Sequence, residues 1–233
     1  MRLQKFLYAA VVLALLVLAH PTDAQEVIMN QPSADVVAQG KLFVRADSFY
    51  TQAPAFYEEN VNFAYGLFKN FEVSLNGADI SHTHTQAAIV PGFKWAIINN
   101  DNFTLYVGDQ YWKPVANNIL YHNGNVTYEA GAFKFKNGRL RITAGTFQSH
   151  NAYQLGNRAG AIGGVEYTLH TFKSGWVLVP GIDYASGRGQ NGYTSLGANL
   201  IKGNFFISPG YQIGNPHQLY GAHQSFVQIG YTF

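Results

Sequence analysis

The chain has 233 residues, of which 15 are basic and 13 acidic, and its formal net charge is +2. Charged residues make up only 12% of the sequence and aromatic residues 15%, whereas a soluble globular domain usually carries about twice that share of charge. The near balance of charge argues against a nucleic-acid or polyanionic partner. Because the sequence contains no cysteine, disulfides and thiolate metal sites are excluded.

The first 24 residues have the three regions of a secretory signal peptide. Arg2 and Lys5 precede an apolar run over residues 6–19, and a stretch of small residues leads to Ala24. The run is shorter than the roughly 20 apolar residues that a spanning helix needs, so we expect cleavage after Ala24 rather than a retained anchor. A polar lead-in follows at residues 25–39, which either hangs free or tucks into the domain formed by residues 40–233.

From residue 41 onward, short segments alternate apolar and polar side chains, which is the pattern of β-strands with one apolar face. No segment after residue 24 approaches the length of a membrane-spanning helix, so a chain that enters a membrane must do so as strands. Twelve strands are expected, at residues 41–50, 60–68, 71–79, 87–98, 102–112, 125–135, 139–148, 159–170, 175–185, 193–201, 204–213 and 225–233.

The joints between these strands alternate between short and long. The short joints are read as hairpin turns, and all but one carry Asn or Gly, which tolerate positive φ. They lie at residues 69–70, 99–101, 136–138, 172–174 and 202–203. The longer joints lie at residues 50–59, 80–86, 113–124, 149–158, 186–192 and 214–224. If the joint at 136–138 is a three-residue hairpin, Phe133 lies opposite Arg141 and Phe135 opposite Arg139.

Three strands carry a Pro-Gly pair within an apolar core, at residues 89–93, 178–182 and 207–211. Proline removes a donor from the hydrogen-bond ladder, so these sites are expected to be bulges that bend the sheet. Gly92, Gly181 and Gly210 then face the inside, where they also clear space for a solute or for a tucked N-terminal segment.

The last strand alternates in the same way and ends the chain on Phe233. A final strand that ends on a bare aromatic carboxylate resembles the closing strand of a bacterial outer-membrane β-barrel. The resemblance covers nearly the whole chain after Ala24, at the level of the class and of no subfamily. It implies that Tyr231 and Phe233 form the signal read by the barrel-assembly machinery, that the wall contacts outer-membrane lipid, and that both termini lie in the periplasm.

The implied fold is all-β, a transmembrane antiparallel up-and-down β-barrel of about 12 strands, with 10 or 14 as alternatives, short periplasmic turns and longer outer loops. The alternative is a soluble β-sandwich or a lipocalin-like barrel, in which the apolar faces point inward. Aromatic residues on one face of nearly every strand, combined with charges on the other, favour the membrane barrel.

In a membrane barrel the polar strand faces line the lumen. The charged residues expected there are Arg45, Asp47, Glu72, Lys94, Glu129, Arg139, Arg141, Glu166 and Asp183. We expect most of them to neutralise one another, because unpaired charges are costly in a narrow interior of low dielectric constant. Glu72 and Lys94, on neighbouring strands near the same rim, are expected to pair.

The histidines gather in the expected outer loops. His82 and His84, together with His122 or His150, have the spacing of a transition-metal site, but histidine is also an ordinary loop residue, so we expect no metal and no other cofactor. Ser81-His82 and Ser149-His150 each place a serine beside a histidine. Catalysis needs a nucleophile with a base in reach, and adjacency in the sequence does not distinguish such a pair from chance. Outer-membrane phospholipase and lipid A deacylase carry His and Ser motifs within strands that this sequence does not match, so no enzymatic activity is expected.

The sequence therefore predicts a narrow passive channel for small solutes, because about 12 strands lie between the eight of a filled barrel and the 16 of an open porin. The alternative is a closed barrel that acts as a structural or surface-interaction module through its outer loops, with a lipid-modifying enzyme as a third hypothesis. A continuous lumen favours the channel. A lumen blocked by the charged set or by residues 25–39 favours the module.

Overall fold

The computed structural model describes residues 28–29, 31–52, 55–82, 87–115, 122–152, 158–187, 192–215 and 223–233. The strands are β1 Leu42–Gln52, β2 Ala55–Phe68, β3 Phe71–Ala78, β4 Ala88–Asn99, β5 Phe103–Pro114, β6 Gly124–Phe135, β7 Leu140–His150, β8 Ala159–Tyr167, β9 His170–Thr171, β10 Val177–Ala185, β11 Tyr193–Lys202, β12 Phe205–Gly214 and β13 His223–Thr232. A short 3-10 helix, η1, spans Ile80–His82. No helix within the described ranges has the length and apolar character needed to cross a membrane.

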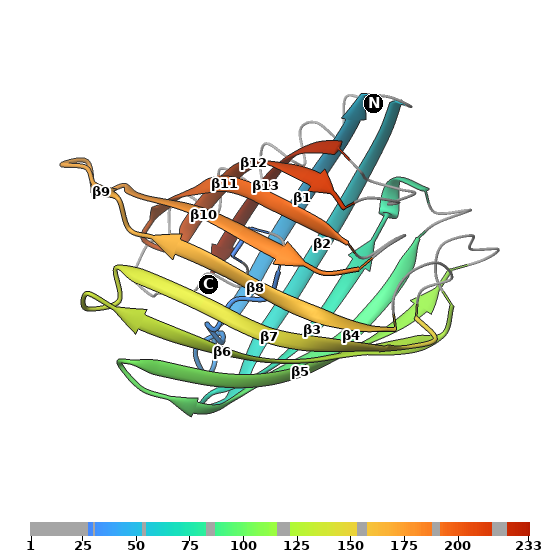
Figure 1. The fold of residues 1–233 in the computed structure, drawn as a ribbon, viewed down its shortest axis with the longest axis horizontal. Coiled ribbons are helices and arrows are strands. Elements are labelled where there is room, and N and C mark those ends of the chain that lie inside the picture. Colours follow the sequence, from blue (N-terminus) through green and yellow to red (C-terminus); the bar gives the residue numbers. More distant parts are fainter. Residues whose placement is uncertain are drawn as a thin grey trace.

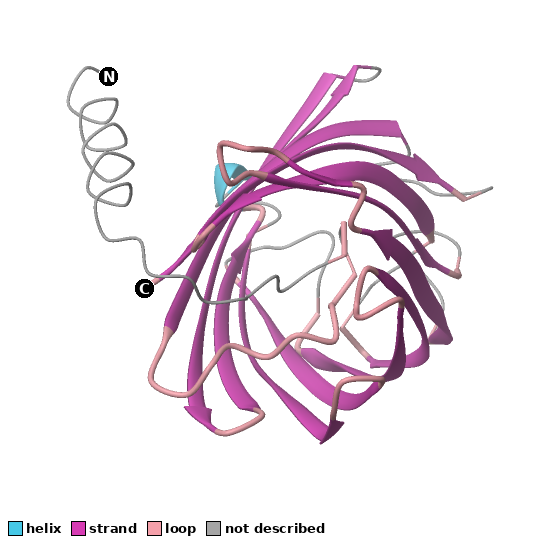
Figure 2. Ribbon diagram, turned by 90° about the vertical axis from the view of Figure 1, so that its left-hand side faces the viewer, coloured by secondary structure: helices cyan, strands magenta, loops and turns pink. Residues whose placement is uncertain are grey.

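The strands form one closed ring (Figures 1 and 2). Each strand from β1 to β8 pairs antiparallel with the next, β8 pairs with β10, and the series continues through β13, which returns to β1. The two-residue strand β9 continues the line of β8 and pairs with the start of β10. The structure thus confirms the predicted up-and-down barrel of about 12 strands, with β9 as one additional short strand.

One rim carries the tight turns and is called the short-turn rim. Phe68 pairs with Phe71 across a two-residue turn in which Asn70 has a φ of 64°. Asn137 and Gly138 have φ values of 56° and 80° in the turn between β6 and β7. These are the positions at which the sequence predicts positive φ, because Asn and Gly tolerate the left-handed region best.

The β6–β7 turn is one residue longer than predicted, and the predicted register is wrong there. Phe135 pairs with Leu140 and Phe133 pairs with Ile142, so neither ring lies opposite an arginine. A shift of one residue in register moves every side chain to the other face of a strand. The observed register keeps the two apolar side chains Phe133 and Ile142 together on the outward face.

The predicted loop at residues 50–59 is mostly strand. β1 and β2 continue until Gln52 pairs with Ala55, and Figure 1 shows these two strands extending past their neighbours. The segment is rich in aromatic and β-branched residues, such as Tyr50 and Thr51, which favour extended structure. The hairpin therefore projects from the rim opposite the short turns.

Two of the three Pro-Gly sites interrupt the ladder without forming the predicted bulge, whereas at Pro180 the register shifts by one residue between Leu178, which pairs with His170, and Gly181, which pairs with Glu166. Pro91 keeps its pairing with β3 but lies in a gap of the β4–β5 ladder, which resumes in the same register. Pro209 lies in a similar gap between β11 and β12. Each residue directs its N–H to one neighbour, so proline costs the pairing on one side only. Register shifts also occur away from proline, at residues 66–68 and 96–98.

Candidate functional site

A stretch of the N-terminal region lies inside the barrel. This inner segment, residues 28–29 and 31–40, contacts strands on several sides of the lumen before it joins β1 at the short-turn rim. Ile28 and Met29 are fully buried, and Ala34 and Val37 are 2% and 1% exposed. Of the two placements considered for the polar lead-in, the structure shows the tucked one for these residues.

Asp183 on β10 holds the first part of the inner segment. One carboxylate oxygen, Oδ2, accepts the backbone N–H of Met29 at 3.0 Å and that of Gln31 at 2.7 Å. The side chain of Gln31 also donates to the hydroxyl of Tyr193, and Asn199 donates to the carbonyl of Ile28 at 3.1 Å. These bonds provide partners for buried backbone groups at Ile28, Met29 and Gln31.

Glu72 on β3 holds the far end of the inner segment. Its Oε2 accepts the backbone N–H of Val37 at 2.6 Å, and its Oε1 lies 3.0 Å from the Nζ of Lys94. Glu72 and Lys94 are direct cross-strand partners, which confirms the predicted pair. Next to it, Gly66 lies so close to the carbonyl of Ala38 that any side chain at this position would collide with the backbone.

An ion-pair chain links the middle of the inner segment to the wall. The Nη1 of Arg141 lies 2.6 Å from an oxygen of Asp35 and 3.6 Å from an oxygen of Glu166. Arg141 and Glu166 are cross-strand partners on β7 and β8. Nearby, the hydroxyl of Tyr106 donates to the carbonyl of Pro32 at 2.8 Å.

Apolar contacts also hold the inner segment in the lumen. Ala34 packs into a buried cluster inside the barrel that includes Tyr106, Tyr128 and Phe147. On the other side of the lumen, a Cβ placed on Gly181 would come 3.2 Å from the Cε of Met29. The predicted inward-facing glycine therefore makes room for the tucked segment.

Arg45 and Asp47 form a separate pair inside the barrel. The Nε of Arg45 lies 2.8 Å from the Oδ1 of Asp47, and Asn62 donates to the other oxygen of Asp47 at 2.8 Å. Both charged side chains are more than nine-tenths buried. Seven of the nine charged residues expected in the lumen thus have inward, largely buried side chains.

The other two residues of the expected set are not buried inside the lumen. Arg139 is exposed in the β6–β7 turn, where its Nη2 donates to the carbonyl of Thr168 at 3.1 Å. Glu129 is exposed on the outward face of β6, where Thr146 of β7 donates to it at 3.3 Å. The rule that polar faces point inward fails on β6, because its apolar face, which includes Tyr128, packs into the buried cluster of the lumen.

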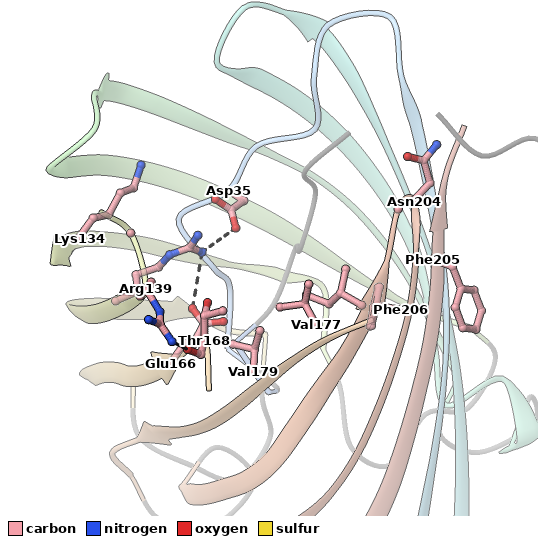
Figure 3. Close-up of a pocket in the computed structure, with 14 residues that line it drawn as sticks. Asp35, Lys134, Arg139, Glu166, Thr168, Val177, Val179, Asn204, Phe205 and Phe206 are labelled. Carbon is pink, nitrogen blue, oxygen red and sulfur yellow. Dashed lines mark hydrogen bonds and ion pairs between the residues drawn. The ribbon is translucent and has the colours of Figure 1, made fainter. Parts of the chain in front are cut away.

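A cavity of about 400 Å³ opens at the short-turn end of the lumen. Figure 3 shows the side chains that line it. Asp35, Arg141 and Glu166 line it together with residues of the adjoining turns, among them Arg139 and Asn204. The inner segment therefore contributes a wall to the cavity.

The histidine and serine residues that were weighed as a metal or catalytic site can be placed only in part. Ser149 is buried, whereas its neighbour His150 is exposed, so this adjacent pair points to opposite faces. The side chain of His82 and the whole of His84 lie outside the described residues. Within the ranges that are described, no three His, Asp or Glu side chains gather in a way that could hold a metal ion.

The C-terminal aromatics lie at the seam between β13 and β1. The rings of Tyr231 and Phe233 are 4.9 Å apart, and the backbone N–H of Phe233 donates to the carbonyl of Leu42 at 2.8 Å. Tyr231 is 3% exposed and Phe233 is 40% exposed. Their role as an assembly signal stays a prediction.

Three residues of the site were missed from the sequence. Asp35, Tyr106 and Tyr193 each bind across the lumen to a partner that is distant in the chain. Asp35 is the one acidic residue of the described inner segment, which is a signal that could have marked it as a partner for the lumenal arginines. Tyr106 and Tyr193 carry no such signal.

No protein-family model and no curated protein matches the sequence. Among solved structures, the KdgM porin in complex with disordered oligogalacturonate is similar to this chain, with a TM-score of 0.53 at 11% identity over 83% of this chain and 98% of that chain. LpxR from Salmonella typhimurium has a TM-score of 0.46 at 10% identity, over 83% and 99% of the two chains. OprD from Pseudomonas aeruginosa has a TM-score of 0.42 at 13% identity, over 83% and 65%. At such identities the likeness concerns the fold alone, and that fold is the one found in bacterial outer-membrane β-barrel proteins.

Proposed function

We propose that the chain is an integral protein of the bacterial outer membrane that acts as a narrow passive channel for small solutes, and that the inner segment closes this channel in the present conformation. The closed ring of 12 strands has a circumference between those of filled barrels and open porins. The likeness in fold to the KdgM porin supports the same function. Passage of a solute requires no catalytic step, so we expect no enzymatic activity.

The observation that carries the proposal is the way in which the inner segment is attached. It is continuous with β1 at Leu42 on the short-turn rim, and side-chain groups of separate strands hold it through Asp183, Glu72 and Arg141. Hydrogen bonds to charged groups contribute roughly 1.5–3 kcal/mol each. A few such bonds can be exchanged for water, which lets the segment withdraw toward the periplasm while the ring stays intact.

The surroundings of the barrel follow from its outward face. Large apolar residues there are exposed, for example Phe63 at 43%, Leu75 at 50% and Trp95 at 48%. Such a wall requires an apolar solvent, so outer-membrane lipid is the expected partner. The barrel-assembly machinery is expected to insert the chain after cleavage near Ala24.

Single-channel conductance in a planar bilayer tests the channel and its closure together. The refolded chain that begins at Gln25 is expected to open rarely, and a version without residues 25–39 is expected to give sustained current steps. The double variant Glu72→Gln/Asp183→Asn should fall between them, because its neutral amides hold the segment more weakly. Glu129→Gln is the matched control, since it neutralises an outward carboxylate, and it should conduct like the full chain.

A second candidate function is the closed barrel that acts as a module. The packed aromatic cluster around Tyr106, Tyr128 and Phe147 favours it, because this part of the lumen is filled by side chains of the wall itself. If the version without residues 25–39 gives no current, the channel hypothesis is overturned and the hypothesis of a closed barrel that acts as a module remains. Equal current from the full chain and the truncated chain would retain a channel but remove the inner segment as its closure.

A further inference from the structure

The cavity at the short-turn end has two chemically different walls. Figure 3 shows Lys134, Arg139 and Glu166 on one side, and Val177 and Phe206 on the other. Val179 and Ile201 add to the apolar lining. At about 400 Å³ the cavity has the size of a small-molecule site, and sites of that kind combine an apolar lining with a few placed polar groups.

The charged wall carries more positive than negative charge. Three basic residues, Lys134, Arg139 and Arg141, line the cavity against two acidic ones, Asp35 and Glu166. Both ion pairs of this cluster are made by Arg141.

The other two cations of this wall are bound to neutral groups. The Nζ of Lys134 donates to the carbonyl of Asn100 at 3.1 Å, and the Nη2 of Arg139 donates to the carbonyl of Thr168 at 3.1 Å. These contacts fix the two side chains without cancelling their charge. The wall is therefore suited to an additional anion.

The cavity already binds one carboxylate, and this carboxylate is tethered. Asp35 belongs to the inner segment and reaches Arg141 at 2.6 Å, while its side chain is 27% exposed. A free carboxylate that enters the cavity meets the same guanidinium. It would compete with Asp35 for a charge-assisted hydrogen bond of the kind that arginine forms most readily.

We propose that this cavity is a binding site for a small amphipathic carboxylate, such as an aromatic acid, and that such a ligand competes with Asp35. The carboxylate lies at Arg139 and Arg141, and the apolar body lies against Val177, Val179 and Phe206. Occupation of the site removes one of the bonds that hold the inner segment. The site requires only the cavity and its two walls, so it stands whether or not the barrel conducts.

Isothermal titration of the refolded chain with benzoate tests the site, with benzyl alcohol as the uncharged analogue and protein-free micelles as the blank. Benzoate is expected to bind at least about tenfold more tightly than benzyl alcohol, because one charge-assisted hydrogen bond corresponds to about that factor. Equal affinity of the two compounds would overturn the proposal. Heat that appears equally in the protein-free micelles, or no heat at all, would also overturn it.

Three variants locate the site and test the competition. Arg139→Gln should weaken benzoate binding roughly fivefold, whereas Lys202→Gln, which removes a cation of the same rim that does not line the cavity, should leave it unchanged. Asp35→Asn should tighten binding severalfold, because it removes the tethered competitor. Equal effects of Arg139→Gln and Lys202→Gln would reduce the interaction to general charge attraction and overturn the site. Weaker or unchanged binding of benzoate to the Asp35→Asn variant would overturn the competition.

The binding site and the channel are tested separately. A conductance that stays zero in every variant would count against the channel hypothesis and not against the binding site.

Discussion

Two sectors of the barrel wall differ in how they distribute polar side chains between the inner and the outer face. In the sector from β5 to β8, Tyr106 and Phe147 point inward and are buried, whereas Glu129 and Thr146 are exposed on the outside. In the sector formed by β11, β12, β13 and β1, polar side chains such as Asn199, Ser208 and Gln228 are buried on the inside beside the rings of Phe43 and Phe206, and outward residues such as Ile229 are apolar. The inner segment packs against both sectors: Ala34 joins the apolar cluster of the first, whereas Val37 and Met29 pack against phenylalanine rings of the second.

This difference teaches that the alternation along a strand determines which residues share a face, but not which face points inward. An empty lumen favours polar side chains on the inside. A lumen that contains a chain segment needs apolar side chains where that segment packs, because its buried groups must meet close-packed partners. The inner segment therefore explains why one sector departs from the usual pattern.

The largest effect that separates the two sectors should come from Tyr106→Ala. This substitution removes a fully buried ring and the hydrogen bond to Pro32, so the free energy of unfolding should fall by about 3–5 kcal/mol. Urea unfolding of the refolded barrel, followed by tryptophan fluorescence, measures it. Tyr111→Ala is the matched control, because Tyr111 is on the same strand but 42% exposed; equal losses would contradict a packed inner face.

A smaller effect is expected from Asp183→Asn on the polar side. The variant keeps the shape of the side chain but weakens the two bonds to the backbone N–H groups of Met29 and Gln31, at a cost of about 1.5–3 kcal/mol. Limited proteolysis should then cut the inner segment faster while the strands stay protected. If Glu129→Gln accelerates cleavage as much, the anchor at Asp183 is refuted.

The seat of Met29 offers a test by coupling. Gly181→Val should cost about 1–3 kcal/mol, because a Cβ at this position meets the end of the Met29 side chain at 3.2 Å. Met29→Ala makes space, so the double variant should lose clearly less than the sum of the single losses. If the losses in the free energy of unfolding of the two single variants simply add up in the double variant, Met29 does not lie against Gly181.

The smallest effect is expected on the outer wall of the first sector. Glu129→Leu replaces an outward carboxylate by an aliphatic side chain, and in lipid vesicles the stability should rise by about 1 kcal/mol, since acidic residues on the lipid face of a barrel are destabilising, but less so than basic ones. The measurement is urea unfolding in vesicles. A marked loss of stability would mean that this wall contacts protein or water and not lipid.

The strands and turns could be predicted from the sequence because their signals are local. The period of two, the Asn and Gly at turns and the final Phe233 each lie within a few residues of the structure that they determine. Glu72 and Lys94 could be paired from the sequence because they lie on consecutive strands near the same rim and carry opposite charges, although a long joint connects these strands.

The closure of the lumen could not be predicted in this way. Met29 and Asp183 are separated by 154 positions, and no local pattern connects them. The prediction for Glu129 is wrong because the other face of its strand, which carries Tyr128, packs into the buried cluster that contains Ala34 of the inner segment. Arg139 lies in the β6–β7 turn at the rim and not within a strand, because this turn is one residue longer than predicted.

Thiol labelling of an Ala34→Cys variant tests the central claim, that the inner segment is buried in the lumen, most directly, since the chain has no native cysteine and Ala34 is 2% exposed. Asn137→Cys, in an exposed turn, gives the reference rate with a water-soluble maleimide. The structure predicts that Cys at position 34 reacts at least about a hundredfold more slowly than this reference, because labelling must await local opening. It also predicts that Glu72→Gln/Asp183→Asn removes most of the protection. Equal rates at the two positions in the otherwise unchanged chain would contradict the claim.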